Sequence, residues 1–283
     1  MTAKALITGI NKYMDQDHCP NLNGCVNDAR DIAHTLNALG IVPPKPSTLK
    51  IITNERATKA NILEGLHWLI DGSKKGDTLI FYYSGHGTQV PDLDGDDFDE
   101  KAEAICPHDF VFDKPDKLIK DDDLQSIFSD LAPGVNLEVI LDSCFSGDGT
   151  RALVGPEEEK ISYRHIDLPL DHSYFIDTHP NASTKSILKP ASGDRGVVYA
   201  PKLNHVLWAA CHEYQRSAEG LFDGVYRGVF TYWFCTVLRK AGKETTRNKL
   251  ISLVSADIKK IRKYDQIPQL EGTKESINEK IFT

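Results

Sequence analysis

The stretch VILDSCFSGDG, residues 139–149, runs from a strand-like apolar segment into a turn of small residues. Its apolar residues are followed by Asp142 and Cys144, and then by Gly147 and Gly149. A cysteine in this place is either an ordinary buried thiol or a nucleophile at the rim of a sheet. The rest of the chain has to decide between these two interpretations.

Strand-like and helix-like segments alternate along the chain, which favours an α/β fold. Strands are expected at residues 4–9, 48–53, 77–85, 136–143 and 204–211. Helices are expected at residues 27–40, 58–69, 121–131, 228–242 and 247–263. Continuously apolar strands separated by helices predict a mostly parallel central sheet with helices on both faces. Residues 151–203 break the pattern and are expected to form a linker or excursion.

The composition is that of an ordinary globular protein. The chain has 283 residues, 40% of them hydrophobic, and a formal net charge of −8, which argues against a nucleic-acid-binding protein. It contains no apolar run long enough to span a membrane and no apolar signal core at its start, so a cytoplasmic protein is expected. The six cysteines include no CxxC pair, which argues against a disulfide scaffold and a structural zinc site.

Two glycine-containing turns follow neighbouring strands of the expected sheet. His86 lies between Gly85 and Gly87 after one strand, and Cys144 follows another. Ligands and active sites gather at the carboxyl edge of such sheets, and an imidazole there raises the thiolate fraction of a cysteine. The alternative for His86 is a histidine in a glycine-containing turn that only caps the end of a strand.

These motifs together resemble the metacaspases, a family of caspase-fold cysteine peptidases. The resemblance rests on SGHG (84–87) and DSCFSG (142–147), and it extends through GCVNDA (24–29), AACHEYQRSAE (209–219), GVFT (228–231) and QIPQLEG (266–272). It covers nearly the whole chain apart from the excursion. The arginine-lined pocket and QAC-type motif expected of a true caspase are not found in the sequence.

The resemblance implies one caspase-like domain over residues 1–283, in a compact form without a prodomain. Residues 1–150 correspond to a large-subunit-like part, 151–203 to the linker, and 204–283 to a small-subunit-like part.

The resemblance also implies roles for the two turns. Cys144 matches the nucleophile and His86 the general base and acid, and the backbone N–H groups of Gly87 and Cys144 match the oxyanion hole. No carboxylate third member is evident, so we expect a Cys–His dyad.

Three further residues match the substrate pocket of the family. Asp28 and Asp142 correspond to its acidic specificity residues and Ser84 to a residue at the pocket side. Two carboxylates beside the nucleophile hold a guanidinium or an ammonium group, so cleavage after Arg or Lys is expected. The alternatives are that Asp28 lies on the surface of an amphipathic helix and that Asp142 accepts hydrogen bonds in a turn.

An acidic loop, residues 91–103, resembles the calcium-binding loop of many metacaspases, although it lacks the sharp-turn glycine of an EF-hand. By this resemblance Asp99, Asp121 and Asp122 are expected calcium ligands. Arg151 stands where the last acidic ligand of the family is found. The alternative for the acids at 121–123 is that they cap the start of a helix.

The sequence therefore predicts a cysteine endopeptidase that cleaves protein and peptide substrates after Arg or Lys, with calcium activation and self-processing as further expectations. Candidate self-cleavage sites are Arg151, Lys160, Arg164, Lys185, Lys189 and Arg195. Three alternatives stay open: an inactive caspase-like scaffold or regulatory binding protein, a calcium-binding signalling module, and an Asp-specific peptidase. The sequence leaves the oligomeric state open.

Overall fold

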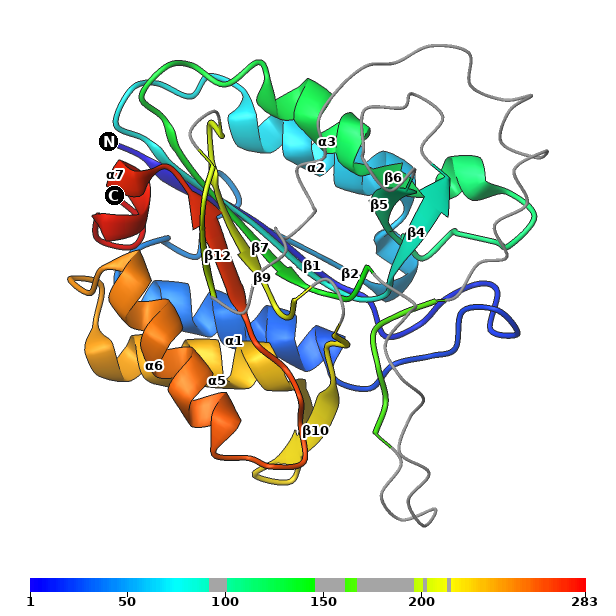
Figure 1. Cartoon of the computed structure of the whole chain (residues 1–283). Coiled ribbons are helices and arrows are strands. Elements are labelled where there is room, and N and C mark those ends of the chain that lie inside the picture. The colour runs from blue at the N-terminus through cyan, green and yellow to red at the C-terminus, as the bar shows by residue number, and fades with distance from the viewer. Residues whose placement is uncertain (92–100, 146–160, 167–195, 201–202, 213–214) are drawn as a thin grey trace.

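A seven-stranded sheet forms the centre of the computed structural model, which describes residues 1–91, 101–145, 161–166, 196–200, 203–212 and 215–283. The strands are β1 (Ala3–Gly9), β2 (Leu49–Thr53), β3 (Thr78–Ser84), β7 (Asn136–Asp142), β8 (Val197–Tyr199), β9 (Val206–Ala209) and β12 (Gln269–Gly272). Their order is β2-β1-β3-β7-β9-β12-β8 (Figure 1). The first five run parallel to one another, and β12 and β8 run in the opposite direction.

Successive side chains of a strand point to opposite sides of the sheet, and in this sheet the side chains on both sides are apolar. In β1, Leu6 belongs to the core cluster on one face, whereas Ala5 and Ile7 belong to the cluster on the other. The continuous apolar runs seen in the sequence are therefore what a sheet covered on both sides requires.

Helices cover the two faces of the sheet, as Figure 1 shows. One face carries α2 and α3, and the other carries α1, α5 and α6. The helices are α1 (Cys25–Ala38), α2 (Lys59–Ile70), α3 (Asp121–Phe128), α5 (Val229–Ala241), α6 (Arg247–Lys259) and α7 (Lys274–Asn278), with 3₁₀ turns at Asn54–Arg56 and Pro115–Lys117. Thr58 begins α2 as expected, since its hydroxyl accepts a hydrogen bond from the Asn61 N–H at 3.3 Å.

Two small sheets lie beside the carboxyl edge of the central one. The first contains β4 (Gly87–Pro91), β5 (Lys101–Ile105) and β6 (Ile119–Lys120), and the second is the hairpin of β10 (Glu219–Phe222) and β11 (Val225–Gly228). Because β4 begins directly after His86, and β10 and β11 carry Glu219 and Gly228, both sheets supply backbone next to the candidate site.

The expected fold class, a caspase-like α/β fold with a mostly parallel sheet between helices, is confirmed. Most element boundaries differ from the sequence prediction by one or two residues, and the ends of α6 and α3 differ by more. Helix α6 ends at Lys259 rather than at 263, and the basic residues that follow it form turns. Helix α3 ends at Phe128 rather than at 131, and α1 spans Cys25–Ala38 rather than 27–40.

The excursion contains structure that the sequence did not indicate. Strand β8 lies within it and pairs in parallel with β12 at the edge of the central sheet, with Leu270 opposite Val197. Residues 161–166 also lie within it, and His165 pairs there with Gly87 at the start of β4. The division into large and small parts stays a prediction.

None of the helices in the described ranges is long and apolar enough to cross a bilayer.

Candidate active site

The candidate site lies where β3 and β7 end side by side. The parallel register of these strands places Ser84 opposite Asp142, and His86 and Cys144 each follow two residues later. The Gly85 N–H donates to the Asp142 carbonyl oxygen at 3.4 Å, so the two turns stay in contact beyond the strands. The fold thus brings the predicted nucleophile and base to one edge of the sheet.

The His86 ring has a defined tautomer. Its Nε2 lies 2.7 Å from the Pro20 carbonyl oxygen. A carbonyl only accepts, so Nε2 carries the hydrogen and Nδ1 keeps its lone pair. Nδ1 is buried and has no hydrogen-bond partner within the described residues. The Tyr13 hydroxyl accepts from the His86 N–H at 2.8 Å, and the Tyr83 hydroxyl donates to the His86 carbonyl at 2.7 Å, which fixes the backbone of the turn.

The surroundings of His86 keep it neutral. Burial is the main cause that lowers the pKa of His86, to about 4, and the charges of His165 and Arg164 lower it further. The hydrogen bond to Pro20 opposes this shift. The imidazole is therefore in its base form at neutral pH, with the free lone pair on Nδ1. The carbonyl of Pro20 orients the ring of the predicted base, a contact that no side-chain pattern in the sequence indicated.

Cys144 is fully buried and lies against the segment before β10. Its Sγ accepts a hydrogen bond from the Ser217 N–H and lies 3.6 Å from the Ser217 carbonyl oxygen. A second thiol, Cys211, is adjacent: its hydrogen bond with Cys144 and its burial raise the pKa of Cys211. Cys211 therefore stays a neutral thiol beside the predicted nucleophile.

The three residues predicted to form the substrate pocket lie together and are fully buried. The Ser84 hydroxyl donates to the Asp28 carboxylate at 3.1 Å. The Asp142 carboxylate accepts from the Ser217 hydroxyl at 2.6 Å and from the Thr231 hydroxyl at 2.5 Å. These bonds hold both carboxylates in fixed positions beside Cys144.

The guanidinium of Arg164 fills this pocket. Its Nη2 lies 2.5 Å from Asp28 and 3.4 Å from Glu219, and its Nη1 lies 2.8 Å from Asp142. The side chains of all four residues are 0% exposed, so the ion pairs are removed from water. Glu219 is a pocket residue that sequence reasoning did not single out, although it ends the quoted segment AACHEYQRSAE.

The electrostatics of Asp28 reflect this crowding. Burial, the largest cause, and the nearby Asp142 raise the pKa of Asp28 to about 7, while Arg164 acts to lower it. The N–H of Gly228 donates to both oxygens of Asp28 at 3.0 Å. A side chain at Gly228 would collide with the Asp142 carboxylate and the Arg164 guanidinium, so only glycine leaves room for the pocket contents.

The two predicted oxyanion donors converge on one oxygen. The N–H groups of Gly87 and Cys144 both donate to the carbonyl oxygen of Arg164, at 3.0 and 3.2 Å. A side chain at Gly87 would collide with the Cys144 carbonyl oxygen, so this close approach of two backbones needs glycine. Two convergent N–H groups beside a thiol are the arrangement that stabilises a tetrahedral oxyanion.

Comparison with known proteins accounts for this combination. The model of the family described as "Metacaspase, peptidase C14 domain" matches residues 3–151, which include His86 and Cys144. The chain belongs to the metacaspase family. By its description this is a peptidase family, and membership agrees with the resemblance seen in the motifs.

Curated metacaspases match most of the chain. Metacaspase-1 of Ajellomyces capsulatus is 31% identical over 291 residues, covering 94% of this chain and 78% of that protein. Metacaspase-1 of Eremothecium gossypii is 29% identical, covering 94% of this chain. The chain spans 63% of the length of the Eremothecium protein.

Solved structures share the fold. A protein of Geobacter sulfurreducens has a TM-score of 0.69 at 23% identity, covering 100% of this chain and 99% of that chain. Caspase-1 of Spodoptera frugiperda has a TM-score of 0.58 at 14% identity, covering 96% and 86%. At these identities the likeness shows the fold alone, and it confirms the caspase-like architecture of this metacaspase.

The predicted calcium ligands are only partly described. Asp99 lies outside the described residues, and Asp121 and Asp122 begin α3, where the Asp122 N–H donates to Asp121 at 3.1 Å. Asp123 acts as a helix cap, accepting from the Lys120 N–H at 3.1 Å and pairing with Lys59 at 3.0 Å. Carboxylates suit calcium, but the described residues contain no group of three or more potential metal ligands.

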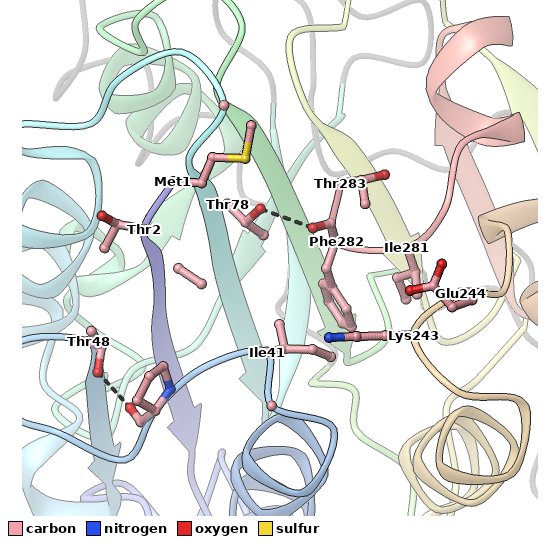
Figure 2. Close-up of a pocket in the computed structure, with 14 residues that line it drawn as sticks. Met1, Thr2, Ile41, Thr48, Thr78, Lys243, Glu244, Ile281, Phe282 and Thr283 are labelled. Atoms are coloured by element: carbon pink, nitrogen blue, oxygen red, sulfur yellow. Dashed lines mark hydrogen bonds between the residues drawn. The ribbon is translucent and has the colours of Figure 1, made fainter.

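A cavity of about 730 Å³ lies at the opposite end of the sheet, where β1 and β3 begin (Figure 2). Ala3 and Thr78 line it together with Ile41, Lys243 and Phe282. Its lining contains neither cysteine nor histidine, so it offers no nucleophile and base. The predicted nucleophile and base both lie at the other end of the sheet.

Proposed function

We propose that this metacaspase is a cysteine endopeptidase that cleaves protein and peptide substrates after Arg or Lys through Cys144 and His86. The observation that carries the proposal is the arginine side chain held by Asp28, Asp142 and Glu219 beside a cysteine. A pocket that surrounds one guanidinium with three carboxylates selects a cationic side chain and repels an acidic one.

The proposed reaction has two stages. His86 Nδ1 takes the proton of the Cys144 thiol, and the thiolate attacks the carbonyl carbon that follows the basic side chain. The N–H groups of Gly87 and Cys144 stabilise the oxyanion. His86 then gives the proton to the leaving amine, which departs as the C–N bond breaks. Water, deprotonated by His86, hydrolyses the thioester and restores the thiol.

The pocket geometry favours arginine over lysine. The guanidinium uses Nη1 for Asp142 and Nη2 for Asp28 and Glu219 at the same time, whereas an ammonium group is a single point charge. We expect kcat/KM for a peptidyl-Arg substrate to exceed that for the matched Lys substrate by about tenfold or more. The matched Asp substrate should not be cleaved. A panel of the three fluorogenic peptides measures this, and preferential cleavage of the Asp peptide would contradict the proposal.

Substrate binding should weaken in mild acid. Asp28 must be ionised to bind the basic side chain, and its pKa is raised to about 7 by burial and by Asp142. That value applies with a guanidinium in the pocket, because Arg164 acts to lower it. Protonation of Asp28 in the empty pocket removes one carboxylate, so KM for an Arg substrate should rise as the pH falls. The base His86 has a lowered pKa when buried, so kcat should persist to more acidic pH. Steady-state kinetics between about pH 5 and 9 separate the pH dependence of KM from that of kcat. A KM that stays constant over this range would show that Asp28 does not bind the substrate.

Calcium activation remains part of the proposal, with Asp99, Asp121 and Asp122 as ligands. Carboxylate oxygens are the donors that calcium prefers, and losing one ligand charge weakens such sites. We expect calcium to raise activity, and Asp122→Asn to raise the calcium concentration for half-maximal activity about tenfold or more. Asp130→Asn, a nearby exposed acid, is the control. Full activity in the presence of a chelator would contradict calcium dependence.

Self-processing and a cytoplasmic location, both expected from the sequence, stay predictions within this proposal.

A further inference from the structure

The segment 161–166 lies in the candidate site as an extended chain. On one side the Arg164 N–H donates to the Ser217 carbonyl at 3.0 Å, and the Glu219 N–H donates to the Ser162 carbonyl at 2.9 Å. Tyr163 pairs antiparallel with Ala218 between these two bonds. This is the pattern of a peptide that adds a strand to an exposed edge.

Beyond Arg164 the chain changes partner and continues along the start of β4. The Ile166 N–H donates to the Gly87 carbonyl at 3.0 Å, and the Thr88 hydroxyl donates to the Ile166 carbonyl at 2.8 Å. Backbone contacts therefore hold the segment both before and after the Arg164–His165 peptide bond. Arg164 is the residue at which the segment changes from one backbone partner to the other.

At that point the side chain and the carbonyl of Arg164 are both in the positions that a substrate needs. The guanidinium occupies the acidic pocket, and the carbonyl oxygen accepts from the N–H groups of Gly87 and Cys144. A purely structural ion pair requires only the first of these contacts. The second joins the Arg164 carbonyl to the backbone of the predicted nucleophile, since its oxygen lies 3.2 Å from the Cys144 nitrogen. His165 is close enough for its charge to lower the pKa of His86.

We propose that the Arg164–His165 bond is the self-cleavage site of this chain and that the uncleaved segment 161–166 blocks the site to other substrates. This deepens the proposed function and rests on it. Cys144 Sγ bonds to the Arg164 carbonyl carbon, the C–N bond to His165 breaks, and the His165 amine leaves with the proton carried by His86. Water then hydrolyses the thioester, leaving a carboxylate on Arg164 and the Cys144 thiol.

Burial explains the blocking role. Asp28, Asp142 and Cys144 are 0% exposed and His86 is 1% exposed, although all four must meet a substrate. No external peptide reaches them while Arg164 occupies the pocket, so activity on other substrates requires the segment to leave. The other basic residues of the excursion named as candidate sites lie outside the described residues.

The test begins with the wild-type chain, incubated under conditions in which it cleaves Arg peptides. Intact mass and N-terminal sequencing should identify a first cut that produces residues 1–164 and a fragment beginning HIDLPL at His165. Peptidase activity should rise in step with this cut. The first-order rate constant should be unchanged over about a hundredfold dilution, because nucleophile and bond belong to one chain.

Three variants sharpen the result. Cys144→Ala should stay intact. Arg164→Ala should lose this cut, whereas Lys160→Ala, the nearest basic residue before it, should keep it. Because the site is assigned on the wild-type chain, the test survives poor folding of any variant.

The outcomes separate this proposal from the proposed function. If Arg peptides are cleaved while the chain stays intact, or is first cut after another residue, the assignment of Arg164–His165 is wrong and the peptidase proposal stands. If neither peptides nor the chain are cleaved, the proposed function itself fails.

Discussion

Replacing Cys144 with alanine is expected to lower kcat/KM on a peptidyl-Arg substrate by about 10³-fold or more. The Cys144 thiol lies beside the two N–H groups that hold the Arg164 carbonyl oxygen, and the neighbouring thiol, Cys211, has a raised pKa. Fluorogenic hydrolysis with a single-turnover assay for the thioester measures the loss.

The matched control is Cys235→Ala, another fully buried cysteine, which lies in α5 away from the sheet edge. It should retain near-wild-type turnover. If Cys144→Ala also retained activity, Cys144 would not be the nucleophile. The hydrolysis would then come from another protein in the preparation, and the alternative of an inactive caspase-like scaffold would be favoured.

Replacing Asp28 with asparagine should reduce kcat/KM for Arg substrates by about 10²- to 10⁴-fold. Asp28 pairs with the guanidinium at 2.5 Å and both side chains are buried, and removing one partner of such a pair costs about 3–5 kcal/mol. The effect should fall mainly on KM, because the carboxylate binds the side chain and does not touch the reacting carbonyl.

Asp31→Asn provides the comparison on the same helix. Asp31 pairs with Arg227 at 2.6 Å and with Arg239 at 2.7 Å, so its carboxylate is engaged by two arginines other than Arg164. It should change KM little. Thermal melting of both variants separates a folding defect from a binding defect. Equal kinetics for Asp28→Asn and the wild type would remove Asp28 from the pocket.

The central strands were predictable because their physical requirement is strong. A strand buried on both faces needs a continuous apolar run, and β1, β3 and β7 each have one between helical patterns. Shorter elements were harder. Strand β8 has only three residues, Val197–Tyr199, within a polar excursion. The motif QIPQLEG, which contains β12, does not reveal that this strand runs antiparallel to β9.

The positions of His86 and Cys144 were predictable because parallel strands end at the same edge. The contact that orients His86 was not, since it uses the backbone carbonyl of Pro20, which any residue type supplies. Glu219 was missed because it lies 55 residues after Arg164, in a polar segment with no period. Arg164 was one of six candidate basic residues, and only the fold shows that its guanidinium lies between Asp28, Asp142 and Glu219.

The nucleophilic role of Cys144 is tested most directly by labelling the self-processed protein with a peptidyl-Arg chloromethyl ketone, followed by peptide mapping. We expect a single thioether at Cys144, formed only after the segment 161–166 has left the site, together with loss of peptidase activity. An adduct on any other of the six cysteines that accompanied the same loss of activity, or full activity with Cys144 completely alkylated, would contradict it.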